Sequence, residues 1–116
     1  MVGQPTLLRD LQEVTIRTDK HPRTPVVICV VVADDEVFVR SWRGAKGHWY
    51  RDLAAGGPAT LKFATRRLAV QALPASDPDA VARASREFLR KYQRSAHAQE
   101  MVRSEILPTT LRLEPR

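Results

Sequence analysis

The sequence predicts a mainly β (α+β) fold, a six-stranded antiparallel barrel with one late α-helix and short helical turns. Six segments show the alternating or β-branched patterns that are typical of strands. One of them, residues 26–32, is apolar at every position, so both of its faces should be covered, in a closed barrel or at a subunit interface. One long stretch has clear helical spacing; it begins at Asp77, an expected N-cap, continues through Pro78 and runs to about Tyr92 or Arg94.

The first half of the chain supplies three of the predicted strands. Residues 14–18 alternate apolar and polar side chains and lead into turn-forming residues at 19–22. The apolar run at 26–32 follows, and the acidic pair at 34–35 then provides a hairpin turn. The third strand returns over residues 36–42. An acidic pair at such a turn is ordinary turn chemistry, so it is not predicted to act as an acid and a base.

Two short segments are predicted to form helical turns. Three leucines at helical spacing indicate one such turn over residues 6–13. Residues 48–55 indicate another, which the two glycines and the proline at 56–58 should end.

The second half supplies a hairpin and the last strand. Residues 60–65 and 68–73 are the hairpin strands, with the arginine pair at 66–67 as their turn. After the main helix, residues 95–107 form either a loop or a second short helix. Residues 109–114 alternate again and are the sixth strand.

The composition predicts one domain, residues 1–116, with a preference for anionic partners. The formal net charge is +6 and the pI is near 10.2, which favours phosphates, nucleotides, nucleic acid or acidic lipid. The single cysteine, Cys29, lies in the apolar run and cannot form an intramolecular disulfide. No apolar run approaches membrane-spanning length, so a cytoplasmic protein with no membrane partner is expected. The three histidines are too scattered to predict a metal site.

The densest chemistry lies where the third strand runs out into a basic, glycine-bearing loop. Arg40, Arg43 and Lys46 concentrate positive charge there. Ser41 and Gly44 add a hydroxyl and an unobstructed backbone amide. Cationic side chains and free amides together suit an oxyanion, so the loop is predicted to contact a phosphate.

Two segments resemble the split-barrel flavin-binding superfamily, which includes the pyridoxamine phosphate oxidases and the deazaflavin-dependent nitroreductases. The first is Arg23-Thr24-Pro25-Val26, at the start of the second strand. The second, residues 41–53, has the order Ser-x-x-Gly-x-x-x-x-Trp-Tyr-x-x-Leu and resembles the phosphate loop of the deazaflavin branch. Residues 14–113 can be laid on that fold.

The resemblance implies a split β-barrel homodimer that binds a flavin-type cofactor, either flavin mononucleotide or the deazaflavin coenzyme, in a cleft between subunits. The activity implied is that of an oxidoreductase that transfers hydride to a small planar acceptor, with no catalytic side chain required. The implied contacts are Arg23 and Thr24 at the polar edge of the ring, Ser41, Arg43, Gly44 and Lys46 at the phosphate, with Arg40 in the same loop, and Trp49 and Tyr50 as a wall.

Other interpretations of the same residues stay open. Trp49 and Tyr50 could serve only to pack a helical turn onto the barrel, since large aromatic side chains mostly bury area. The protein could be a structural or regulatory split-barrel dimer that binds no cofactor. It could also be a basic nucleic-acid-binding module, although an aromatic content of 6% leaves few side chains on which bases would stack.

Overall fold

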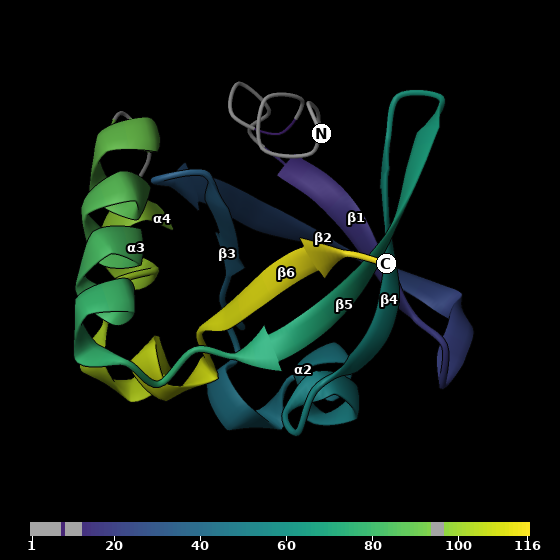
Figure 1. Ribbon diagram of the computed structural model, residues 1–116. Helices are drawn as coiled ribbons and strands as arrows, with labels where there is room; N and C mark the ends of the chain where they lie inside the picture. Colours follow the sequence, from purple (N-terminus) through teal and green to yellow (C-terminus); the bar gives the residue numbers. More distant parts are fainter. Residues whose placement is uncertain (1–7, 9–12, 94–96) are drawn as a thin grey trace.

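The chain folds as a closed six-stranded antiparallel β-barrel with two helices packed on one side and a third, short helix at another place on the barrel (Figure 1). This architecture is seen in a computed structural model that describes residues 8, 13–93 and 97–116. The strands are β1 Glu13–Thr18, β2 His21–Ala33, β3 Glu36–Val39, β4 Gly57–Phe63, β5 Arg66–Pro74 and β6 Leu111–Pro115. The helices are α2 His48–Leu53, α3 Pro78–Lys91 and α4 His97–Glu100, with 3₁₀ turns η1 at Gly44–Lys46 and η2 at Ser104–Thr109.

The strand order around the barrel is β1-β2-β3-β6-β5-β4, and β4 closes the ring against β1. Hairpins join β1 to β2, β2 to β3 and β4 to β5. The last strand, β6, enters between β3 and β5, antiparallel to both. The predicted six-stranded antiparallel barrel with one late helix is therefore confirmed.

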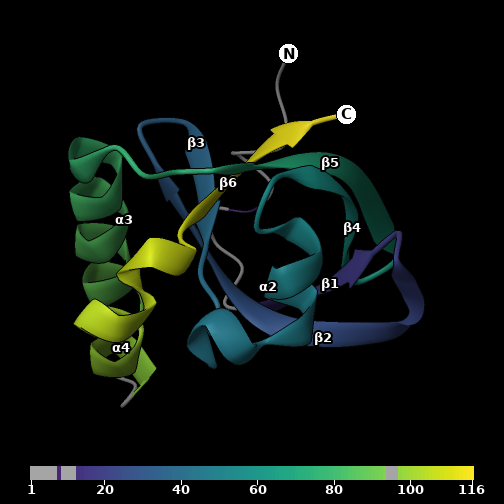
Figure 2. The ribbon, with the colours of Figure 1, turned by 90° about the horizontal axis from the view of Figure 1, so that it is seen from below.

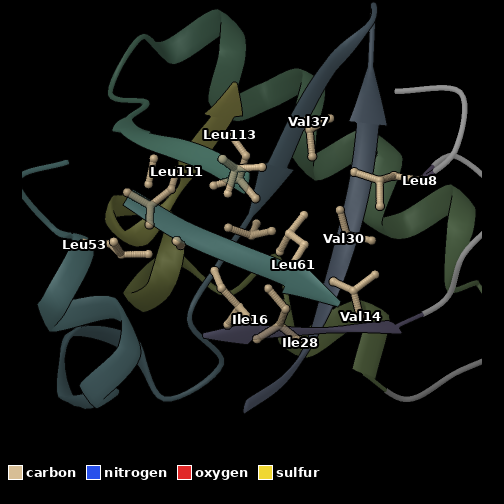
Figure 3. Packing of buried hydrophobic residues seen from close by; sticks show 14 of the residues in the cluster. Leu8, Val14, Ile16, Ile28, Val30, Val37, Leu53, Leu61, Leu111 and Leu113 are labelled. Carbon is tan, nitrogen blue, oxygen red and sulfur yellow. The ribbon is translucent and has the colours of Figure 1, made fainter. Parts of the chain in front are cut away.

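The barrel interior is an apolar core to which every strand contributes, as Figure 3 shows for side chains such as Ile16, Val30, Leu61 and Leu113. The short helix α2 contacts β1 and β4 (Figure 2), and its Leu53 joins this core. The core therefore extends from the strands to α2, which fixes the loop that precedes α2.

A second core lies outside the barrel, between β2 and α3. Val31 and Ala33 on the outer face of β2 pack with Ala84 and Phe88 of α3. The prediction that both faces of the apolar run are covered is thus correct for its second half, where a helix provides the cover. The first half is uncovered within the single chain, where Val27 is 61% exposed, so its cover by a second subunit stays a prediction.

Three of the predicted boundaries that are wrong have an identifiable cause. The third strand ends at Val39 instead of residue 42, because the Ser41 amide donates to Thr109 Oγ1 at 3.0 Å and leaves the ladder. The second strand begins at His21, since a tight turn pairs Thr18 with His21. The β4–β5 turn lies at residues 64–65 and the arginines at 66–67 are in β5, because Phe63 pairs with Arg66.

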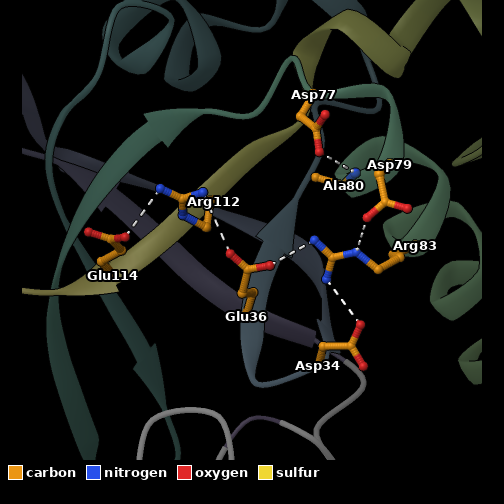
Figure 4. A network of polar contacts seen from close by, with 8 residues as sticks. All are labelled: Asp34, Glu36, Asp77, Asp79, Ala80, Arg83, Arg112 and Glu114. Atoms are coloured by element: carbon orange, nitrogen blue, oxygen red, sulfur yellow. Dashed lines mark hydrogen bonds and ion pairs between the residues drawn. The ribbon is translucent and has the colours of Figure 1, made fainter.

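The start of α3 is tied to the β2–β3 hairpin by a polar network (Figure 4). Asp77 is the predicted N-cap and accepts from the Ala80 amide at 3.2 Å. The guanidinium of Arg83 bonds Asp34 at 3.2 Å and Glu36 at 2.8 Å, so one helical side chain holds both sides of the turn. The hydrogen bond from Arg83 to Glu36 is the largest reason why the pKa of Arg83 is raised.

The remaining predictions concern the ends of the chain and the membrane. The helical turn predicted over residues 6–13 lies outside the described residues except for Leu8, which is buried, and Glu13, which begins β1. Of the two options left open at 95–107, the helical one is correct within the described part, where α4 and η2 lie. Among the described residues, no helix is long and apolar enough to cross a membrane.

Candidate functional site: an apolar pocket beside the basic loop

A pocket of about 340 Å³ opens beside the uncovered first half of β2. Val27 and Cys29 from the outer face of β2 form one wall. Trp42 and Trp49, which flank the basic loop, and Met101, just beyond α4, form the others. Because these side chains are apolar, the pocket suits a flat hydrophobic ligand.

The two tryptophans of the chain both line this pocket. Trp49 is buried in the barrel core, which confirms the packing role, and it also lines the pocket, where contact with a cofactor ring stays a prediction. Trp42 is 50% exposed, and its indole nitrogen donates to Glu100 Oε2 at 2.8 Å. Arg103 Nη2 donates to the Trp42 carbonyl at 2.7 Å. Trp42 is thus fixed to the segment around α4, which preorganises this wall.

Cys29 behaves as a wall residue and not as a reactive thiol. It is half-buried and free. Burial, with a smaller contribution from the charge of Glu13, raises the pKa of the Cys29 thiol. A thiol with a raised pKa carries little thiolate at neutral pH, which argues against a nucleophilic role.

Most of the donors that were predicted to bind an anion form hydrogen bonds within the basic loop instead. Ser41 Oγ donates to the Gly44 carbonyl at 2.7 Å, and the Gly44 amide donates to the Ser41 carbonyl at 2.9 Å. The Gly47 amide donates to the Gly44 carbonyl at 3.2 Å. Ser41 and Gly44 are also buried. They shape the loop, and the expectation that they present a hydroxyl and an amide to a phosphate is not supported by this geometry.

Arg40 is a structural residue in this geometry and not a free phosphate contact. It is 1% exposed. Its Nε donates to Thr110 Oγ1 at 2.8 Å, its Nη1 to the Met101 carbonyl at 2.9 Å and its Nη2 to the Val81 carbonyl at 2.8 Å. The guanidinium also lies 5.1 Å from the ring centroid of Phe88. Because these donors already have protein acceptors, the geometry does not support the predicted phosphate contact of Arg40, which stays a prediction.

Arg43 and Lys46 keep exposed side chains, and neither has a hydrogen bond or an ion pair to any residue in the described part of the chain. They differ in position, since Arg43 lines the pocket and Lys46 does not. A ligand in the pocket would therefore meet one uncommitted cation at its edge.

The other predicted residues lie away from the pocket. Arg23 and Thr24 are exposed near the start of β2 and are not part of its lining. Tyr50 is partly buried against the barrel core, and its hydroxyl is 3.5 Å from the Pro108 carbonyl. The structure thus brings Arg40, Ser41, Arg43 and Trp49 together at the pocket but leaves out Arg23, Thr24, Gly44, Lys46 and Tyr50.

Sequence reasoning missed several lining residues. Val27 and Cys29 are alternate positions of the apolar run, so strand periodicity could have placed them on one face. Trp42 adjoins the predicted loop and His48 begins the predicted helical turn, which made both visible as candidates. Met101 carried no signal in the sequence.

A polar corner adjoins the pocket where the β1–β2 hairpin meets α2. Asp52 Oδ2 accepts from Thr18 Oγ1 at 2.7 Å and lies 2.5 Å from His21 Nδ1. The His21 amide also donates to Thr18 Oγ1 at 3.1 Å. The His48 ring stands edge-on to the His21 ring at 6.0 Å between centroids.

The pKa of Asp52 is lowered in this corner. Burial is the largest single influence and opposes the shift, but the hydrogen bonds from Thr18 and His21 and the charges of His21 and Lys20 together outweigh it. The carboxylate therefore stays ionised and holds the hairpin to α2.

Replacing Asp52 with asparagine should destabilise the protein more at pH 6 than at pH 3, because the pKa of this carboxyl is lowered in the folded state. A carboxylate with a folded pKa below its unfolded value adds stability above the unfolded value, and loses it as the pH falls through the folded value. The wild type should thus lose its advantage over Asp52→Asn only in acid, below about pH 4. Urea unfolding of both proteins at the two pH values measures this difference. An advantage at pH 3 as large as that at pH 6 would contradict the assigned role.

A second groove, of about 500 Å³, runs along the outer face of β1 and β4. Three cations, Arg17, Lys62 and Arg67, line it together with Phe63. It shares Glu13 and Val27 with the first pocket, so the two hollows adjoin on the same side of the barrel. In the described ranges, no group of three or more His, Cys, Asp or Glu side chains could hold a metal ion.

The fold and the site together define a small β-barrel protein with an apolar, cation-edged pocket on its outer face. The chain belongs to the family described as uncharacterised proteins conserved in bacteria (DUF2255), whose model matches residues 6–113. No curated protein matches the chain. The family match spans β1 to β5, the first part of β6 and every residue of the pocket lining.

Proposed function

We propose that the pocket binds a flavin-type cofactor, the deazaflavin coenzyme or flavin mononucleotide, and that the protein is an oxidoreductase acting on a small planar acceptor. The observation that carries this proposal is an apolar pocket walled by two indoles with an uncommitted arginine, Arg43, at its edge. Aromatic walls suit a flat ring, and the guanidinium suits a phosphate.

The pocket fits the ring of such a cofactor well, but it offers few free donors to the phosphate. A volume of about 340 Å³ lies within the range of small-molecule sites. The amides of Gly44 and Gly47 and the hydroxyl of Ser41 are used inside the loop, so the phosphate would depend mainly on Arg43. When bound, such a cofactor supplies the hydride, and the chain has to bind and orient it.

The proposal includes a homodimer and a cytoplasmic setting. The exposed apolar side chains of Val27 and Trp42 lie at the pocket, where a second subunit would exclude water from the ring. A free cysteine in the pocket wall is typical of a reducing compartment.

The pocket contains its own reporters, which allows a direct test. Both tryptophans line it, so intrinsic tryptophan fluorescence reports on this site. Titration with flavin mononucleotide and, separately, with the deazaflavin coenzyme should quench this emission saturably. The same ligand should also protect Cys29, the single cysteine, from a small thiol reagent. Light scattering of the same samples gives the oligomeric state.

A charge placed at the pocket mouth provides the matched control. Val27→Glu adds an anion to an exposed pocket residue and should weaken a phosphate-bearing ligand about tenfold or more. Leu89→Glu makes the same change at an exposed site on α3 outside both hollows and should have no effect. If the two variants bind the ligand with equal affinity, the ligand binds outside this pocket.

Removing the two loop cations one at a time should give unequal results. Arg43→Ala should weaken a phosphate-bearing cofactor by about 1.5 to 3 kcal/mol, the usual value of a hydrogen bond to a charged group. Lys46→Ala should change the affinity less than twofold, because Lys46 does not line the pocket. Fluorescence titration of both variants measures this. A larger effect at Lys46 than at Arg43 would place the phosphate elsewhere in the loop.

The cation-lined groove favours one second candidate, a binding module for nucleic acid. Arg17, Lys62 and Arg67 could follow a phosphate backbone, with Phe63 as a partly buried stacking surface. Affinity for single-stranded DNA should then fall steeply with salt, whereas pocket binding of a cofactor should persist. If neither type of ligand binds, the remaining account is a cofactor-free structural or regulatory dimer.

A further inference from the structure

We propose that His48 is the proton-transfer group of the pocket and that His21, oriented by Asp52, exchanges protons between His48 and solvent. This inference rests on the proposed function. It specifies the substrate class as planar acceptors, such as quinones, whose reduction takes up a proton together with a hydride.

His48 is the group in the pocket wall whose side-chain type suits this task. Histidine is the side chain that ordinarily changes charge between pH 5 and 8. The other titratable groups in the described lining are Glu13, Cys29, Arg40 and Arg43. Burial raises the pKa of Cys29 and lowers the pKa of Arg40 only to about 10, so neither cycles its proton near neutrality.

The second imidazole is held in a defined orientation. Asp52 Oδ2 lies 2.5 Å from His21 Nδ1, and Thr18 Oγ1 anchors the same carboxylate oxygen at 2.7 Å. With Nδ1 committed to the carboxylate, Nε2 is the nitrogen left for proton exchange. The Asp52 side chain is only 10% exposed, while that of His21 is 53% exposed. His21 therefore joins a buried carboxylate to solvent.

The two rings lie close together, and in the proposed relay the proton passes between them through water. Their centroids are 6.0 Å apart and their planes cross at 76°. His48 and Asp52 lie one helical turn apart on α2, so they share a face that meets the β1–β2 hairpin. Lys20 is the further charged group that acts on this corner, through its effect on Asp52.

The chemistry balances with a reduced cofactor as the source of hydride. One hydride and one proton convert a quinone to a hydroquinone, and the hydride carries both electrons. Protonated His48 donates its proton to the acceptor oxygen that gains negative charge and becomes neutral. His21 then protonates His48 and is itself reprotonated from solvent.

The test compares His48→Gln and His21→Gln with Arg51→Gln, a change at an exposed position of the same helix. Cofactor affinity, measured by tryptophan fluorescence, should stay within about twofold of wild type in all three. The rate of quinone reduction by the prereduced cofactor complex is then measured from pH 5 to 9. His48→Gln should slow it about a hundredfold, the lower range for loss of a general acid, and should remove its decline at high pH.

His21→Gln should slow turnover about tenfold, and added imidazole buffer should restore it, as expected for a lost proton relay. A second readout needs no activity: the NMR titration curve of the His48 imidazole should change in His21→Gln and stay as in wild type in Arg51→Gln. Urea unfolding checks that each variant folds.

The outcomes separate the two proposals. If wild type binds neither cofactor, the proposed function fails and this inference fails with it. If the cofactor binds and His48→Gln keeps the wild-type rate and pH profile, only the inference is overturned. An unchanged His48 titration curve in His21→Gln would overturn the relay.

Discussion

Replacing Arg40 with methionine is expected to lower the free energy of unfolding by about 3 kcal/mol or more. Methionine matches much of the volume but leaves the carbonyls of Val81 and Met101 and the Thr110 hydroxyl without their donor. Each unsatisfied buried acceptor costs about 1 to 3 kcal/mol, which exceeds the gain from no longer burying a charge. Urea unfolding followed by circular dichroism measures the change.

Arg86→Met is the matched control, since Arg86 is exposed on α3 and should tolerate the change within about 0.5 kcal/mol. Arg40→Lys should recover little of the lost stability, because one ammonium on a flexible stem cannot reach three acceptors on three segments. A stable Arg40→Met protein that has lost only cofactor affinity would reverse the structural assignment and restore Arg40 as a ligand contact.

Gly47→Ala is expected to cost about 2 kcal/mol, the usual size of an overpacking penalty. A β-carbon at position 47 would lie 2.5 Å from Ser41 Oγ, which real β-carbons do not tolerate. The Ser41 side chain is buried and bonded to the Gly44 carbonyl, so it cannot move aside without losing that bond. Thermal and urea unfolding of the variant measure the loss.

A double-mutant cycle tests the cause of this loss. Ser41→Ala removes the atom that the new methyl group would meet, so Gly47→Ala should cost clearly less in a Ser41→Ala background. The coupling energy should be about 1 kcal/mol or more. Additive effects would show that the cost arises from the backbone at position 47 and not from contact with Ser41.

The barrel could be predicted from the sequence because local patterns of apolar and polar residues mark its strands. Periodicity placed each strand to within a few residues, and Asp77 with Pro78 marked the start of α3 correctly. The error at the end of the third strand arises because a backbone group there finds its partner far along the chain. The Ser41 amide is bonded by Thr109, and no local pattern near residue 41 reports that partner.

The site was harder to predict because the role of each side chain depends on the face of the strand from which it projects. Arg40 stands two positions after Phe38, which faces α3, so strand parity places the arginine on the helix side. The acceptors that give Arg40 its structural role come from distant segments, and strand parity does not predict them. Likewise His48 and Asp52 are visibly one helical turn apart, whereas the position of His21 beside them follows from the β1–β2 pairing.

The dual burial of β2 has a consequence for the dynamics of the whole chain. Val30 packs inside the barrel and its neighbour Val31 packs under α3, so separating either layer exposes the same short piece of backbone. Local opening of one layer without the other is therefore disfavoured, and the two layers should unfold as a single cooperative unit. The amides of residues 30–33 should accordingly be among the slowest in the chain to exchange with deuterium, whereas amides near the exposed start of β2 should exchange early.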